Sequence, residues 1–208
     1  MPRVETKMDE HIASLIGQIR QIETEIERKL AERRKDLKYR LDNRRVIFER
    51  AAIEQQRKFK IGLFRFLRKS PLLNILTSPF IYGMIAPFAF LDLSIWIYQR
   101  TCFAAWRVPR VNRADYIVFD RHRLAYLNSI QKLNCLYCGY ANGLIAMVRE
   151  VAGRTEQYWC PIKHAIRVRS THNRYREFAE YGDAEDFLRK SRELRRQLEA
   201  EARAANAR

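Results

Sequence analysis

Cysteine, histidine and glycine are scarce in this chain of 208 residues, which holds four cysteines, four histidines and seven glycines. Cys102 stands close to a long apolar stretch, and the other three cysteines stand together further along, so the four offer no natural pairing scheme. This distribution excludes the disulfide-dense class of small secreted domains. We therefore expect the three grouped cysteines to act as metal ligands rather than as disulfide partners.

The sequence also predicts no secretory signal, because the first thirty residues are charged and periodic and lack a short apolar core with a small-residue cleavage site. Acidic residues are few: 24 Asp and Glu face 40 Lys and Arg, which gives a formal net charge of +16. Between Arg33 and Lys69, fourteen basic residues face four acidic ones. Such a stretch attracts phosphate, and an anionic membrane lipid is a better match than nucleic acid, because no finger, homeodomain or RNA-binding signature is present.

Residues 1–70 are interpreted as a long basic amphipathic helix. Apolar residues recur three and four positions apart, as in Ile12, Leu15, Ile16, Ile19, Ile22, Ile26 and Leu30. A helix of this length without its own core favours a coiled coil with a second copy or another protein, or a contact with the C-terminal helix. A single solvated helix is the alternative, because Arg33, Arg40 and Arg44 interrupt the apolar seam.

The end of this region has the composition of a helix that lies on a membrane surface. Its aromatic and aliphatic residues would enter the acyl boundary while its cations meet anionic headgroups. The cations predicted to bind the membrane surface are Lys58, Lys60, Arg65, Arg68 and Lys69.

Residues 71–99 are predicted to be a membrane segment. Leu72 to Tyr98 carries one charge, Asp92, and is long enough to cross about 30 Å of hydrocarbon as a helix. Pro79 and Pro87 interrupt it, so a single kinked span and a re-entrant hairpin both fit, with a buried helix of a soluble domain as a third interpretation.

Both flanks of this segment carry cations and no acid, from Arg57 to Lys69 and from Arg100 to Arg113. The distribution of cations places both flanks on the cytoplasmic side, at the inner membrane of a bacterium. The cytosol also keeps thiols reduced, which suits a set of cysteine ligands.

Residues 100–182 are interpreted as a small helical metal-binding domain. Its ligands would be Cys135, Cys138, Cys160 and His164, in the pattern C-x2-C-x21-C-x3-H, which favours tetrahedral zinc, with an iron–sulfur cluster as the alternative. A turn at residues 139–143 would separate a helix ending near Leu136 from a second short helix, and Cys160 would cap a third helix before Pro161, which would lower its thiol pKa. Buried core cysteines and a redox dithiol are the competing interpretations.

Three charged residues between the two ligand pairs, Glu150, Arg154 and Glu156, are candidates to orient His164 or to bind the thiolates. Simple surface charge is the alternative for each of them. Residues 183–208 are predicted to form a charged helical tail.

The run Leu133-Asn-Cys-Leu-Tyr-Cys-Gly-Tyr-Ala-Asn-Gly143, together with Arg154-Thr-Glu-Gln-Tyr-Trp-Cys-Pro-Ile-Lys-His164, resembles an uncharacterised bacterial family of small membrane-associated proteins. The resemblance covers about residues 71–165. It implies membrane association but neither an activity nor catalytic residues.

These patterns predict a mainly α fold and a membrane-anchored adaptor or assembly protein that holds a structural zinc ion and has no catalytic activity. The alternative is an iron–sulfur or thiol redox component acting at the membrane. A lipid-modifying enzyme and a nucleic-acid binder are the minor alternatives.

Overall fold

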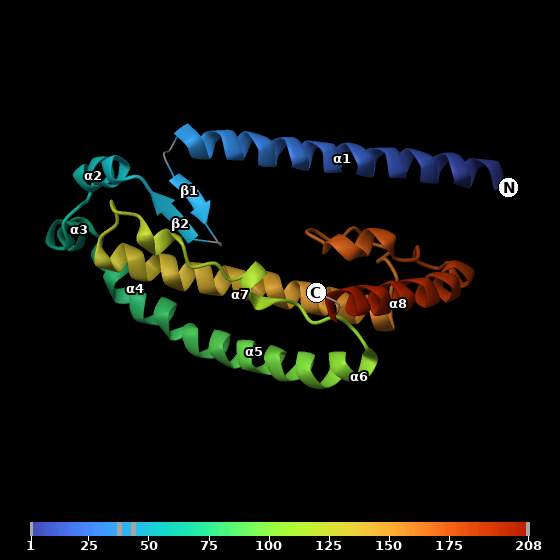
Figure 1. Ribbon diagram of the computed structural model, residues 1–208. Helices are drawn as coiled ribbons and strands as arrows, with labels where there is room; N and C mark the ends of the chain where they lie inside the picture. The colour runs from blue at the N-terminus through green and yellow to red at the C-terminus, as the bar shows by residue number, and fades with distance from the viewer. Residues whose placement is uncertain (1, 37–38, 43–44, 207–208) are drawn as a thin grey trace. The chain divides into compact units, whose positions relative to one another are not determined.

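The computed structural model describes residues 2–36, 39–42 and 45–206 and is mainly helical, as the sequence predicts. It divides into two compact units: residues 1–61 with 123–128, and residues 62–122 with 129–208 (Figure 1). The second unit contains the apolar segment and all the predicted metal ligands.

The first unit contains a long helix followed by a β-hairpin and a short helix. Its elements are α1 (Pro2–Asp36), β1 (Tyr39–Asp42), β2 (Arg45–Phe48) and α2 (Arg50–Lys58). The antiparallel strands pair Tyr39 with Phe48, whose ring centroids are 5.3 Å apart. Cross-strand aromatic pairs and the β-branched Val46 and Ile47 favour strands, so the prediction of one helix through residues 1–70 is wrong beyond Asp36.

The described side chains of α1 include an exposed apolar stripe whose members are three or four positions apart, on one face of the helix. Its members are Leu15, Ile19, Ile22, Ile26 and Leu30, each at least 39% exposed. The predicted coiled coil therefore stays a prediction, with this stripe as the surface available for it.

The second unit is built from helices joined by irregular segments. They are α3 (Leu63–Lys69), α4 (Leu72–Gly83), α5 (Ile85–Tyr98), a π-helical turn η1 (Gln99–Phe103), α6 (Ala104–Trp106), the 3-10 turns η2 (Arg113–Asp115) and η3 (Arg121–Arg123), α7 (Ser129–Trp159), the 3-10 turn η4 (Asn173–Glu177) and α8 (Ala184–Asn206).

The predicted membrane segment, residues 71–99, lies in one gently curved course from α4 to α6 (Figure 1). The 35 residues of this course, Leu72–Trp106, are long and apolar enough to cross a membrane. The boundary between α4 and α5 falls at Met84, just before Pro87. Proline has no N–H to donate to the carbonyl four residues earlier, which explains the interruption there. The course does not reverse its direction, so the re-entrant hairpin is wrong.

Helix α7 runs parallel to this course within the second unit (Figure 1). Near the start of α7, the Tyr82 and Tyr137 ring centroids are 5.9 Å apart. Further along, the Tyr98 and Thr155 hydroxyl oxygens are 2.9 Å apart, and near the end Trp106 stacks on Tyr158. One long helix therefore accompanies the apolar segment over most of its length.

Residues 107–122, which we call the return segment, run back along α5 and α7 mostly without helix. Arg154 Nη1 of α7 donates to the Pro109 carbonyl at 2.6 Å near one end. Near the other end, a Cβ added to Gly139 would lie 3.3 Å from the Val118 carbonyl oxygen. Between these points Val111 and Ile117 join the core around Phe103, Leu144 and Leu198.

The glycines predicted to form a turn lie inside α7. A Cβ on Gly143 would lie 2.5 Å from the Tyr116 carbonyl oxygen and 2.9 Å from the Ile117 Cα. Gly139 and Gly143 are one helical turn apart on the same face, so together they let the return segment approach the helix backbone. The predicted turn is wrong because these glycines serve close packing rather than a change of chain direction.

Candidate functional site

The structure does not bring the four predicted metal ligands together. Cys135 and Cys138 lie in the first part of α7, whereas Cys160 follows its last residue. The uninterrupted helix between Cys138 and Cys160 separates them by roughly 33 Å, at 1.5 Å per residue. In the part of the chain that the structure describes, no group of three or more Cys, His, Asp or Glu is placed to hold a metal ion. In this structure the four residues therefore do not form one site for a zinc ion or for an iron–sulfur cluster.

Cys160 does not cap a helix N-terminus as the sequence analysis expects. It lies at the C-terminal end of α7, and burial together with the nearby Glu156 raises the pKa of its thiol. The negative end of a helix disfavours a thiolate, in agreement with this direction. His164 is exposed, and its backbone N–H donates to the Tyr175 hydroxyl at 2.5 Å.

Glu150 and Arg154 bind each other rather than His164. Arg154 Nε donates to Glu150 Oε1 at 2.8 Å across one turn of α7, and Arg174 Nε reaches the same oxygen at 3.0 Å. Burial opposes ionisation of Glu150, but the two guanidinium groups outweigh it and hold the pKa of this carboxyl below its ordinary value of 4.5. The spacing of Glu150 and Arg154, four positions apart on a helix, is the sequence signal for this pair.

Glu156 binds a histidine that the sequence analysis did not select. Its Oε2 lies 2.8 Å from Nε2 of His172, and the ring of His172 packs over Gly153, where a Cβ would approach to 2.9 Å. Arg174 was not selected from the sequence either, and its side chain is only 18% exposed. Arg174 joins Glu150, Gln157 and Glu201 by hydrogen bonds of 2.7 to 3.2 Å. These contacts fasten residues 160–183 to α7 and α8, which is a structural role.

The lone charge of the apolar segment has partners on two other elements. Asp92 accepts from Arg113 Nη2 of the return segment at 2.8 Å, and from the Tyr140 hydroxyl of α7 at 3.1 Å. The side chain of Asp92 is 19% exposed, whereas that of Arg113 is 51% exposed. A carboxylate held in an ion pair is a poor general base, so this arrangement does not favour catalysis by Asp92.

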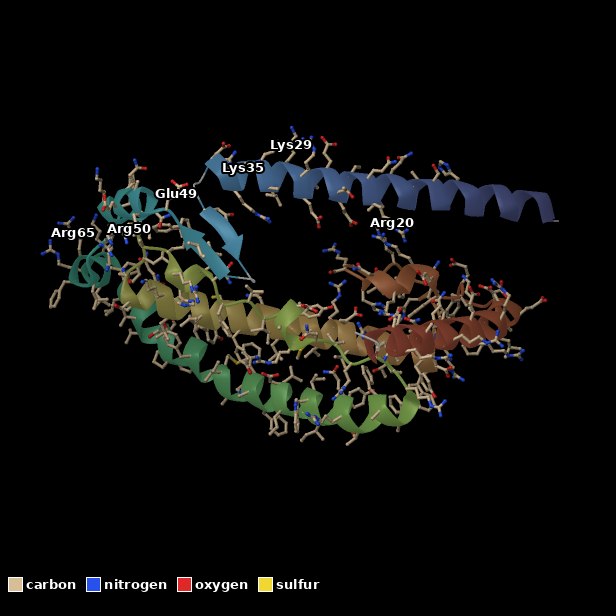
Figure 2. The ribbon with its side chains drawn as sticks, viewed as in Figure 1. Arg20, Lys29, Lys35, Glu49, Arg50 and Arg65 are labelled. Atoms are coloured by element: carbon tan, nitrogen blue, oxygen red, sulfur yellow. The ribbon has the colours of Figure 1, made fainter. Side chains whose placement is uncertain are left out.

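The five predicted membrane-binding cations fall into two groups. Lys58 and Lys60 belong to the first unit, and Arg65, Arg68 and Lys69 lie on α3 in the second. All five are exposed, and Phe64 of α3 is 91% exposed. Figure 2 labels Arg65 on this helix. Cationic and large apolar side chains thus share one short exposed helix, as expected for an interfacial element.

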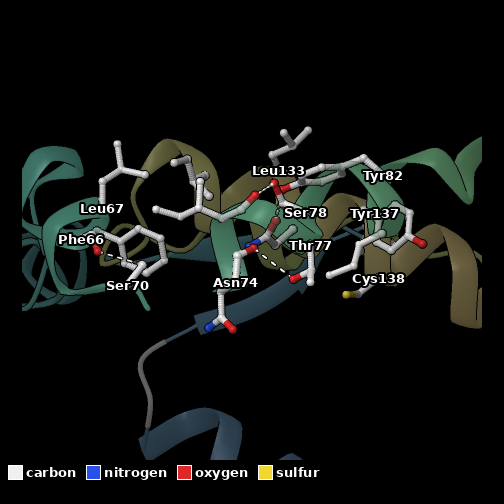
Figure 3. A pocket seen from close by; sticks show the side chains of 14 residues that line it. Phe66, Leu67, Ser70, Asn74, Thr77, Ser78, Tyr82, Leu133, Tyr137 and Cys138 are labelled. Atoms are coloured by element: carbon white, nitrogen blue, oxygen red, sulfur yellow. Dashed lines mark hydrogen bonds between the residues drawn. The ribbon is translucent and has the colours of Figure 1, made fainter. Parts of the chain in front are cut away.

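An open apolar cavity of about 690 Å³ lies between α3, α4 and the start of α7 (Figure 3). Most of its wall is aliphatic or aromatic. Two of its hydroxyls are engaged within α4: Thr77 Oγ1 donates to the Leu73 carbonyl at 2.9 Å, and Ser78 Oγ to the Ile75 carbonyl at 2.7 Å. Cys138 is the only thiol among the lining residues, and no histidine or carboxylate accompanies it. The cavity suits an apolar ligand and lacks the base that nucleophilic catalysis needs.

Comparisons with protein-family models, with curated proteins and with solved structures give no match to this chain. The resemblance to a bacterial membrane-associated family therefore stays a prediction.

Proposed function

We propose that this protein is a non-catalytic membrane-surface protein, anchored by α4 and α5 lying in the plane of an anionic membrane. The outward face of these helices is apolar from one end to the other. Its members are Leu72, Leu73, Leu76, Phe80, Ile81, Phe90, Leu93, Trp96 and Ile97, each at least 48% exposed. Monomeric soluble proteins rarely expose so continuous an apolar surface, which favours contact with lipid.

The observation that carries the in-plane arrangement is the course of the return segment. If α4 and α5 crossed the bilayer, the exposed residues 112–115, three of them polar, would lie at the depth of the hydrocarbon beside them. Irregular backbone is tolerated at that depth only where protein or a water-filled cavity surrounds it. An exposed Arg113 would be costly there as well. An in-plane helix avoids both costs, because only its outward face enters the acyl layer.

Cations flank the apolar face at both ends. Arg65, Arg68 and Lys69 precede it on α3, and Arg100, Arg107 and Arg110 follow it, all exposed. In-plane binding places both groups at the headgroups of the same leaflet, where each cation near an anionic surface contributes about 1 kcal/mol. We assign this leaflet to the cytoplasmic face of a bacterial inner membrane, which puts both ends of the chain in the cytosol.

The role proposed for α1 is to recruit a partner protein or to join copies of this chain. Its apolar stripe, from Leu15 to Leu30, is exposed and regularly spaced. A second copy of this chain or another helical protein would bury that stripe as a coiled coil. The protein would then act as an adaptor that holds such an assembly at the membrane.

Binding of the full chain to phosphatidylcholine vesicles tests the anchor. We expect Phe90→Asp to weaken vesicle binding by roughly ten-fold or more, because burying a phenylalanine side chain contributes about 1.5–3 kcal/mol. Ile166→Asp is the matched control, since Ile166 is 83% exposed and lies outside the face. Equal weakening by both variants, or wild-type binding by Phe90→Asp, would contradict the proposed anchor.

A further inference from the structure

A second, smaller cavity of about 220 Å³ lies where α5 passes into the π-helical turn η1, and the return segment lines its other side. At about 30 Å³ per water molecule, it has room for roughly seven waters. Three arginines line it, Arg100, Arg110 and Arg113, together with Asp92 as its one carboxylate. The cavity therefore has an excess of positive charge.

The carboxylate does not neutralise all of this charge. Asp92 is engaged by Arg113 at 2.8 Å and by Tyr140. Arg100 stacks over the Trp96 ring, with its Cζ 4.9 Å from the ring centroid. Within the described residues neither Arg100 nor Arg110 forms an ion pair, so two guanidinium groups keep their donors available at the cavity.

A buried amide adds a neutral donor to the same wall. Gln99 is 6% exposed, and its Oε1 accepts from the Val111 backbone N–H at 2.6 Å. The hydrogen bond uses the oxygen and leaves the amide NH₂ of this cavity-lining side chain as a donor. Gln99 and Arg100 both belong to the π-helical turn, a distortion that is frequent at functional sites.

The cavity also borders the apolar face. Trp96 lines the cavity and is 53% exposed, and its neighbours Leu93 and Ile97 belong to the outward face of α5. Tryptophan is enriched at the level of lipid headgroups. Donors for an anion thus lie beside the surface proposed to enter the acyl layer.

We propose that this cavity binds the phosphate group of an anionic phospholipid. Arg100 and Arg110 would supply charge-assisted hydrogen bonds to the phosphate oxygens, and the Gln99 amide would donate a third. The proposal rests on the proposed function, because only a protein held at the membrane surface presents this cavity to headgroups. It adds a specific lipid contact to the general attraction between cations and an anionic leaflet.

The test compares binding of the full chain to vesicles of phosphatidylcholine alone and to vesicles that also contain phosphatidylglycerol. Gln99→Glu keeps the acceptor for Val111 N–H and replaces the amide donor by a carboxylate. We expect Gln99→Glu and Arg110→Gln each to reduce the gain from phosphatidylglycerol by ten-fold or more. Arg167→Gln removes the same charge from an exposed position outside the cavity and should change this gain less than two-fold.

The outcomes separate the two proposals. Loss of the phosphatidylglycerol gain in the cavity variants, with unchanged binding to phosphatidylcholine, supports the phosphate site. Equal losses in Arg110→Gln and Arg167→Gln would overturn it and leave only diffuse electrostatic attraction. If the cavity variants weaken the binding of inorganic phosphate but leave vesicle binding unchanged, the cavity binds free phosphate, and the proposal of an anionic phospholipid is overturned. Failure of the wild-type protein to bind any vesicle would instead overturn the proposed function.

Discussion

Asp92 in α5 and Arg113 in the return segment form an ion pair with 2.8 Å between Oδ2 and Nη2. The pair joins the apolar helix to a segment 21 residues later in the chain. It explains how a carboxylate is accommodated in the otherwise uncharged stretch from Leu72 to Tyr98. It also fixes the return segment beside α5, which is the arrangement that argues against a transmembrane course.

Removing the carboxylate should destabilise the second unit. We expect Asp92→Ala to lower the free energy of unfolding by about 1–2 kcal/mol, because Arg113 and Tyr140 lose a shared acceptor in a partly exposed site. The double variant Asp92→Leu with Arg113→Leu should recover part of this loss, since an apolar pair leaves no charge unpaired. Chemical denaturation followed by circular dichroism measures both effects.

Glu199 provides the control for this experiment. It pairs with Arg203 on the exposed side of α8, and Glu199→Ala should change stability by less than about 0.5 kcal/mol. An Asp92→Ala variant as stable as Glu199→Ala would show that the pair does not hold the return segment.

Acid should weaken the contact between α7 and residues 160–183. The pKa of Glu150 is lowered in the folded state by Arg154 and Arg174, against the effect of burial. Its ionised form therefore stabilises the fold fully above the ordinary value of 4.5, and this contribution disappears as pH falls through the lower folded-state pKa. Glu150→Gln should cost about 1–2 kcal/mol at pH 7 and little once wild-type Glu150 is protonated. Unfolding curves at several pH values should converge in acid, and parallel curves would contradict this assignment.

Gly143 should not tolerate a side chain. The Cβ of Gly143→Ala would meet the Tyr116 carbonyl oxygen at 2.5 Å and the Ile117 Cα at 2.9 Å, and backbone cannot move aside as a flexible side chain can. We expect a loss of about 1–3 kcal/mol in stability. Gly17→Ala in α1 is the matched control, because no atom lies within 4 Å of its added Cβ, and it should be neutral or slightly stabilising. Similar melting temperatures for the two variants would refute the close approach.

Chelation should leave the fold unchanged. If one ion were bound by both Cys138 and Cys160, replacing either cysteine by serine would release the metal and remove much of the protein's stability. Because α7 separates these residues by roughly 33 Å, we expect a chelator to leave the melting temperature of the protein unchanged. Elemental analysis of protein purified without oxygen completes the test, and one zinc per chain lost equally from Cys138→Ser and Cys160→Ser would contradict the structure.

Features with strong local signals were predicted from the sequence. Apolar composition predicted the helix from Leu72 to Tyr98, and helical periodicity predicted α1 as far as Asp36. The mainly α fold followed from these patterns. The β-hairpin at Tyr39–Phe48 was missed, because its alternating residues were interpreted as a continuation of the helical spacing.

The four predicted ligands lie apart for a reason that spacing alone does not reveal. Gly139 and Gly143 are usual turn residues, but here they are packing positions inside α7, against backbone that arrives from a distant part of the chain. Because α7 continues through these glycines, Cys135 and Cys138 lie far from Cys160. The contacts of His172 with Glu156 and of Arg174 with Glu150 are likewise tertiary, so spacing along the chain does not reveal them.

The depth of α4 and α5 in the bilayer distinguishes an in-plane anchor from a transmembrane helix. Single cysteines at Leu73, Phe80, Phe90 and Ile97, in a chain whose four native cysteines are replaced by serine, carry a spin label on the outward face. The in-plane account predicts four similar depths, about 5–10 Å below the headgroups. Depths that pass from one surface through the bilayer centre to the other would contradict it and establish a transmembrane helix.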